Sequence, residues 1–148
     1  MANQSSETKD FFIIGIGASA GGVQALEAFF SNLPDHPSAA FVVVQHLSPD
    51  YKSMMTEILQ RKTQLPVHEI VDGVVIEPSH AYVLPPGKLV TVNNRQLRLE
   101  KRKRNFNYPV NKFFQSAAIQ WGEKVVGFVL SGTGNDGTEG LIAISEAG

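Results

Sequence analysis

Residues 11–22 read Phe11-Phe12-Ile13-Ile14-Gly15-Ile16-Gly17-Ala18-Ser19-Ala20-Gly21-Gly22. The apolar run at 11–16 predicts a parallel strand that is covered on both faces. The glycines after it predict a tight turn, and apolar residues at helical spacing from Val23 onward predict a helix that Pro34 ends. Ser19 therefore lies on a strand-to-helix turn, where free helix N–H groups suit a phosphate or a developing oxyanion. The turn alone leaves both interpretations open.

Two further segments extend this pattern. A second apolar run at 39–44 ends in Gln45-His46, and the two strands with the helix between them form a right-handed, parallel βαβ unit. Residues 125–147 read as an apolar strand, a glycine-rich turn and a helix. We therefore expect an α/β fold with a doubly wound, mostly parallel sheet and flanking helices, similar to a Rossmann fold.

The segment from Pro66 to Glu100 has a different character. Short β-rich pieces alternate there with the turn signals Asp72-Gly73, Pro85-Pro86-Gly87 and Asn93-Asn94. This pattern predicts an antiparallel β-hairpin extension attached to the parallel sheet. The run Lys101-Arg102-Lys103-Arg104 that follows is interpreted as a solvated connector, although four adjacent cations could also dock an acidic partner.

Composition limits the function classes. The chain has 148 residues, of which 43% are hydrophobic and 18% charged, as expected for one domain with a buried core. A formal net charge of −1 gives no global attraction to nucleic acid or to an anionic membrane. Cysteine is lacking, and no apolar run approaches the ~20 residues of a membrane span. We expect a cytoplasmic protein with a disordered leader over residues 1–10 and one domain over 11–148.

A nucleotide-binding domain is one alternative. Gly15-x-Gly17-x-x-Ala20 and a similar run that starts at Gly132 fit the spacing of a dinucleotide fingerprint. That fingerprint also needs an acidic residue at the end of the second strand, where this chain has Gln45-His46. Asp35 has about the right separation but lies in the loop before that strand. The residues therefore give a nucleotide cofactor little support.

A catalytic triad is the interpretation that the residues favour. Ser19, His46 and Asp136 follow three predicted strands whose carboxyl ends share one crevice. Each has a structural alternative, because serine and aspartate often cap helices and a buried histidine can bond to the backbone. The remaining histidines, His36, His68 and His80, lack metal-ligand spacing, so we assign them structural roles and predict no metal.

Three motifs in this order resemble those of CheB-type chemotaxis protein-glutamate methylesterases. They are Ile16-Gly17-Ala18-Ser19-Ala20-Gly21-Gly22, Gln45-His46 and Leu130-Ser131-Gly132-Thr133-Gly134-Asn135-Asp136-Gly137, and the segment 80–87 is also similar. The resemblance runs from about Phe12 to Gly148. It implies Ser19 as nucleophile, His46 as general base and Asp136 as the carboxylate that orients it. It also implies that the backbone N–H groups of Ala20, Gly21 and Thr133 hold the oxyanion.

The resemblance implies hydrolysis of glutamate side-chain methyl esters on the cytoplasmic helices of chemoreceptors, within a phosphorelay signalling system and without any cofactor. Some members also deamidate glutamine. The family often has Thr where Ala20 stands, Met at Thr133 and Asp at Asn111. Family domains continue further, so we expect a domain that is incomplete at its C-terminus, self-association through exposed apolar surface, and a parent protein with fused methyltransferase or sensor domains. A noncatalytic signalling or interaction module remains the alternative.

Overall fold

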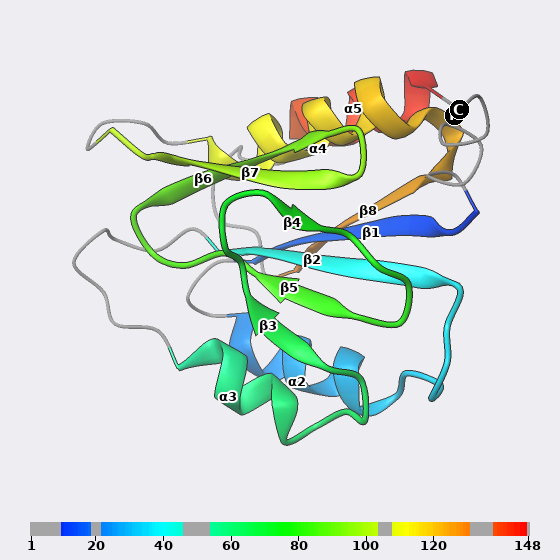
Figure 1. The fold of residues 1–148 in the computed structure, drawn as a ribbon, viewed down its shortest axis with the longest axis vertical. Helices are drawn as coiled ribbons and strands as arrows, with labels where there is room; N and C mark the ends of the chain where they lie inside the picture. The colour runs from blue at the N-terminus through cyan, green and yellow to red at the C-terminus, as the bar shows by residue number, and fades with distance from the viewer. Residues whose placement is uncertain (1–9, 19–21, 46–53, 104–107, 131–137, 148) are drawn as a thin grey trace.

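The protein folds around a parallel β-sheet. The computed structural model describes residues 10–18, 22–45, 54–103, 108–130 and 138–147. Within these residues the sheet has five strands in the order β3-β5-β2-β1-β8 (Figure 1). The strands are β1 (Phe12–Ala18), β2 (Ala39–Gln45), β3 (Val67–Glu69), β5 (Ala81–Val83) and β8 (Val125–Leu130). All neighbouring strands run parallel, which confirms the predicted doubly wound α/β fold.

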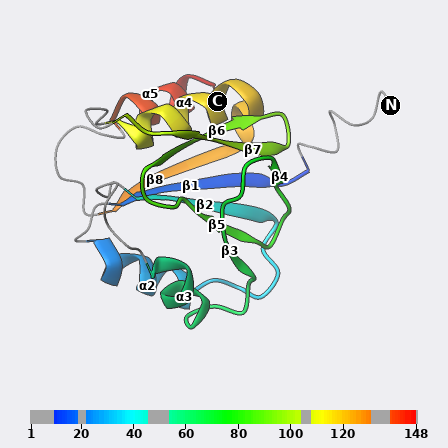
Figure 2. The same cartoon turned by 60° about the vertical axis from the view of Figure 1, so that its left-hand side comes forward.

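Helices cover both faces of this sheet (Figures 1 and 2). On one face lie α2 (Val23–Ser31) and α3 (Met55–Gln60), and on the other lie α4 (Pro109–Trp121) and α5 (Thr138–Ala147). A short 3-10 turn, η2 (Gly122–Lys124), joins α4 to β8. Each layer of helices encloses its own apolar cluster, because β1 and β2 send alternate side chains to opposite faces. No described helix has the length and apolar character needed to cross a membrane.

A second, antiparallel sheet lies beside α4. It has the order β4-β7-β6 and consists of β4 (Val74–Val75), β6 (Lys88–Asn93) and β7 (Gln96–Lys101). The indole N–H of Trp121 donates to the Asn94 carbonyl at 2.6 Å, and the Val92 N–H donates to Ser116 Oγ at 2.9 Å. These bonds hold the β6–β7 hairpin along α4, with its turn near the end of that helix.

The predicted hairpin is present, but it is not attached to the parallel sheet as we expected. Instead, the pieces at 67–69 and 81–83 extend the parallel sheet as β3 and β5, and the antiparallel strands form a separate sheet. All three residues of β5 are buried because the strand lies between β2 and β3. Short apolar pieces do not reveal from the sequence which sheet they will join.

Glycine allows α4 to approach both the sheet and α5 closely. A Cβ atom on Gly15 would lie 2.7 Å from Cε1 of Phe114, and one on Gly140 would lie 2.5 Å from Cβ of the same residue. Nearer the start of α4, a Cβ atom on Gly17 of β1 would lie 2.6 Å from Cγ1 of Val110. Real Cβ contacts are not this short, so these three positions require glycine. The first turn of α4 consequently lies against the last residues of β1.

Candidate active site

Three neighbouring strands, β2, β1 and the edge strand β8, end side by side at the carboxyl edge of the sheet. The last residue of β1, Ala18, is the register partner of Gln45, which is the last residue of β2. On its other side, Ala18 is the register partner of Leu130, the last residue of β8. The three strands therefore end at neighbouring positions on this edge, which is where parallel α/β sheets commonly bind their ligands.

The predicted site residues themselves lie outside the described residues. This holds for Ser19, His46 and Asp136, and equally for the predicted oxyanion donors Ala20, Gly21 and Thr133. Their neighbours along the chain are described: Ser19 follows Ala18, and His46 follows Gln45. The triad and its oxyanion donors therefore stay a prediction. What the structure describes is the alignment of the strand ends that precede them.

In the part of the chain that the structure describes, no side chain caps the N-terminus of the helix that follows β1. Its N-cap residue is Gly22, which is buried and offers no side-chain acceptor to the first turn of α2. The first N–H groups of a helix have no partners within the helix and carry a partial positive charge. This feature agrees with the predicted use of the turn after β1 to hold negative charge.

The start of α5 is held by a side chain from α4. The backbone N–H of Gly140, the third residue of α5, donates to Oδ1 of Asn111 at 2.9 Å, and Asn111 is only 6% exposed. Asn111 thus accepts one of the N–H groups that a helix start leaves unpaired. No local pattern predicts this contact, because its two residues are 29 positions apart. The resemblance raised Asn111 only as a departure from aspartate, and both residue types offer an acceptor oxygen.

Gln45 is a second polar residue whose position the sequence did not explain. It is 7% exposed at the end of β2, and its Nε2 atom has no hydrogen-bond partner among the described residues. Burying an unpaired amide N–H costs about 1–3 kcal/mol, so buried polar groups are usually paired. The unpaired amide is adjacent in sequence to His46 and lies at the edge where the predicted site would be.

His68 and His80 form a pair away from this edge. Nε2 of His68 and Nδ1 of His80 lie 2.9 Å apart, and both rings lie near Tyr82. Burial, with a smaller contribution from His80, lowers the pKa of His68 below its usual 6.5. Burial likewise raises the pKa of Tyr82, whose hydroxyl donates to the Val75 carbonyl at 3.3 Å. The described residues contain no group of three side chains able to hold a metal, and the structural roles assigned to both histidines stay a prediction.

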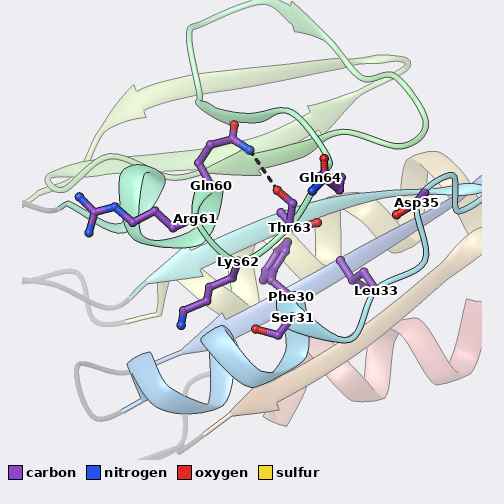
Figure 3. Close-up of a pocket in the computed structure, with 9 residues that line it drawn as sticks. All are labelled: Phe30, Ser31, Leu33, Asp35, Gln60, Arg61, Lys62, Thr63 and Gln64. Atoms are coloured by element: carbon purple, nitrogen blue, oxygen red, sulfur yellow. Dashed lines mark hydrogen bonds between the residues drawn. The ribbon is translucent and has the colours of Figure 1, made fainter.

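A polar hollow of about 510 Å³ lies between the ends of α2 and α3 (Figure 3). Its lining includes Ser31, Asp35, Gln60 and Lys62. Asp35 precedes β2 and so lies at the amino end of that strand. The acidic residue considered for ribose binding is thus at the opposite end of the sheet from the carboxyl end of β1.

These features define a doubly wound α/β protein with a candidate site at the carboxyl edge of its parallel sheet. The chain belongs to the CheB methylesterase family, whose family model, described as CheB methylesterase, matches residues 14–148.

Relatives and a solved structure agree with this membership. The chain is 35% identical to protein-glutamate methylesterase/protein-glutamine glutaminase 2 of Methanospirillum hungatei, over 95% of this chain and 41% of the relative. It is 36% identical to protein-glutamate methylesterase/protein-glutamine glutaminase 1 of Xanthomonas euvesicatoria, over 92% of this chain and 39% of the relative. The chain thus spans well under half the length of these curated relatives. The crystal structure of the Thermotoga maritima CheB methylesterase catalytic domain superposes on this chain with a TM-score of 0.80 at 28% sequence identity. The superposition covers 93% of this chain and 76% of the Thermotoga maritima chain.

Proposed function

We propose that this domain hydrolyses methyl esters of glutamate side chains, with Ser19 as nucleophile, His46 as general base and Asp136 as the orienting carboxylate. The observation that carries the proposal is the register of Ala18 with Gln45 on one side and Leu130 on the other. This register makes Ser19 and His46 the next residues along two adjacent strands. Membership of the CheB methylesterase family supports the same chemistry.

The reaction would follow the usual course of serine acyl transfer. His46 takes the proton of Ser19 Oγ as that oxygen attacks the ester carbonyl, and Asp136 orients the imidazole and stabilises its charged form. Backbone N–H groups of Ala20, Gly21 and Thr133 hold the oxyanion of the tetrahedral intermediate. His46 then protonates the departing methoxide, so that methanol leaves. A water molecule activated by His46 attacks the acyl-enzyme and releases the glutamate carboxylate together with free Ser19.

The names of the relatives suggest the substrate class. Both are protein-glutamate methylesterases and protein-glutamine glutaminases. We extend this to the present chain and propose, as its substrates, glutamate methyl esters on the cytoplasmic helices of chemoreceptors, which would place the protein in the cytoplasm. Glutamine deamidation would use the same residues, with ammonia leaving in place of methanol. Neither reaction needs a metal or an organic cofactor.

The test is methanol release from a methylated receptor fragment. Replacing Ser19 by alanine should lower kcat/KM on the order of 10⁴-fold or more if its oxygen is the nucleophile. Ser31→Ala is a matched control, because Ser31 is an exposed residue at the end of α2 whose hydroxyl donates only within its own helix. Equal methanol release by the Ser19→Ala variant and the unaltered chain would refute the assignment and favour a noncatalytic interaction module.

A further inference from the structure

Three exposed lysines lie together at the open end of the β6–β7 hairpin. Lys88 and Lys101 are direct register partners in the antiparallel ladder, so their side chains leave the same face. The backbone N–H of Arg102 donates to the Gly87 carbonyl at 2.9 Å, which continues the pairing by one residue. Arg102 is buried, whereas Lys103 is exposed like Lys101. We call Lys88, Lys101 and Lys103 the lysine patch.

The lysine patch is not neutralised by the part of the chain that the structure describes. Two carboxylates, one on the hairpin and one bonded to it, are already engaged, since Glu100 pairs with Lys112 at 3.5 Å and Asp72 pairs with Arg98 at 3.4 Å. Like charges directly opposite each other on two strands destabilise a sheet. A chain with a formal net charge of −1 thus keeps a local positive cluster that does not help it fold.

The lysine patch lies at the same end of the molecule as the candidate active site. Lys112, which pairs with the neighbour of Lys101, belongs to the first turn of α4. Val110 of that turn contacts β1 at Gly17, one residue before the end of the strand. Figure 1 shows the same arrangement, with the start of β6 and the end of β7 on the side where β1 and β2 end.

We propose that the lysine patch docks acidic residues that flank the reacting glutamate on a helical protein substrate. This inference rests on the proposed function, because it assumes that a glutamate ester of the substrate binds at the carboxyl edge of the parallel sheet. Carboxylates three or four positions apart share one face of a helix, so a glutamate-rich helix presents a row of charges beside its ester. The three lysines offer separate ammonium point charges, which suit such scattered carboxylates, whereas planar arginine forks are typical of phosphate and nucleic-acid recognition.

The first experiment measures binding and needs no catalysis. A fluorescein-labelled helical peptide with four unesterified glutamates is titrated with the chain at low salt, beside a peptide with glutamine in their place. We expect tighter binding of the acidic peptide. Lys88→Gln combined with Lys101→Gln should weaken that binding about fivefold, as expected for two exposed ion pairs, and added salt should remove the difference.

The matched control carries the same change of charge elsewhere. Arg61→Gln combined with Lys62→Gln removes two exposed cations near the end of α3, so its affinity for the acidic peptide should stay within twofold of the unaltered chain. Unfolding in urea should show that the Lys88→Gln, Lys101→Gln variant is no less stable, because a like-charge pair has been removed. Equal weakening by the two double variants, or equal affinity for the two peptides, would overturn the proposal. So would tighter binding of single-stranded DNA or anionic vesicles that depends on the same lysines.

A kinetic experiment distinguishes this inference from the proposed function. Methanol release is measured on the acidic peptide with one glutamate methylated, and the Lys88→Gln, Lys101→Gln variant should raise KM while kcat stays within twofold. If the unaltered chain releases no methanol, the proposed function fails, and the binding experiment still decides the docking. If it releases methanol and the double variant has the same KM, the docking proposal fails alone.

Discussion

Replacing Asn111 by leucine should destabilise the start of α5. The Asn111 side chain accepts a hydrogen bond from the Gly140 N–H at 2.9 Å in a buried position, and leucine fills a similar volume without an acceptor. A buried N–H that loses its partner costs about 1–3 kcal/mol. Leucine is the better helix former by a few tenths of a kcal/mol, which offsets a small part of this loss within α4. We expect a net loss of about 1–2 kcal/mol in the free energy of unfolding.

Urea unfolding followed by circular dichroism measures this loss directly. For a chain of this size, 1–2 kcal/mol corresponds to a fall in Tm of roughly 2–8 °C. Asn111→Asp is the matched variant, because its carboxylate keeps an acceptor oxygen and carries a charge that a helix N-terminus favours. It should lose clearly less stability than Asn111→Leu. The leucine variant should also release methanol more slowly, since α5 begins two residues after Asp136.

Two results would refute this reasoning about Asn111. An unchanged free energy of unfolding for Asn111→Leu would mean that the Gly140 N–H finds another partner at no cost. Equal losses for Asn111→Leu and Asn111→Asp would mean that shape, and not the hydrogen bond, makes this position sensitive.

Further predictions concern packing and pH. Gly140→Ala should lower the free energy of unfolding by about 1–3 kcal/mol, because the new Cβ would lie 2.5 Å from Cβ of Phe114. This loss outweighs the better helix propensity of alanine. A urea midpoint at or above that of the unaltered chain would contradict the prediction. Folding lowers the pKa of His68. The contribution of His68 to the free energy of unfolding is therefore present above pH 6.5, is lost as the pH falls below 6.5, and stays lost below the folded pKa. The His68→Gln variant should therefore lose less unfolding free energy than the unaltered chain when the pH falls from about 7.5 to about 5.5. An unchanged pH dependence would refute this. Replacement of the exposed His36 by glutamine is the control.

Much of the fold could be predicted from local patterns. The apolar runs at 39–44 and 125–130 became strands of the parallel sheet, the first central and the second at its edge, and the helical periodicity after Pro109 became α4. These elements are long and strongly periodic, so burial alone decides their type. The pieces at 67–69 and 81–83 were too short for that, and their place in the parallel sheet depended on which neighbours they met.

The candidate site, too, could be predicted only in part from the sequence. Glycine-rich turns after apolar strands carry their own signal, so the sequence by itself determined that Ser19, His46 and Asp136 would follow strands, and the family resemblance determined their predicted roles. The alignment of the three strand ends at Ala18, with its two register partners, was decided only by the tertiary structure.

Two further features had no local signal at all. They are the bond from Gly140 to Asn111 and the burial of the Gln45 amide. The sequence by itself determined that Ser19 and Asp136 come between an apolar strand and a helix in chain order. Only the tertiary structure decided what surrounds that edge, because those contacts join residues that are distant in the chain and depend on how helices and strands pack.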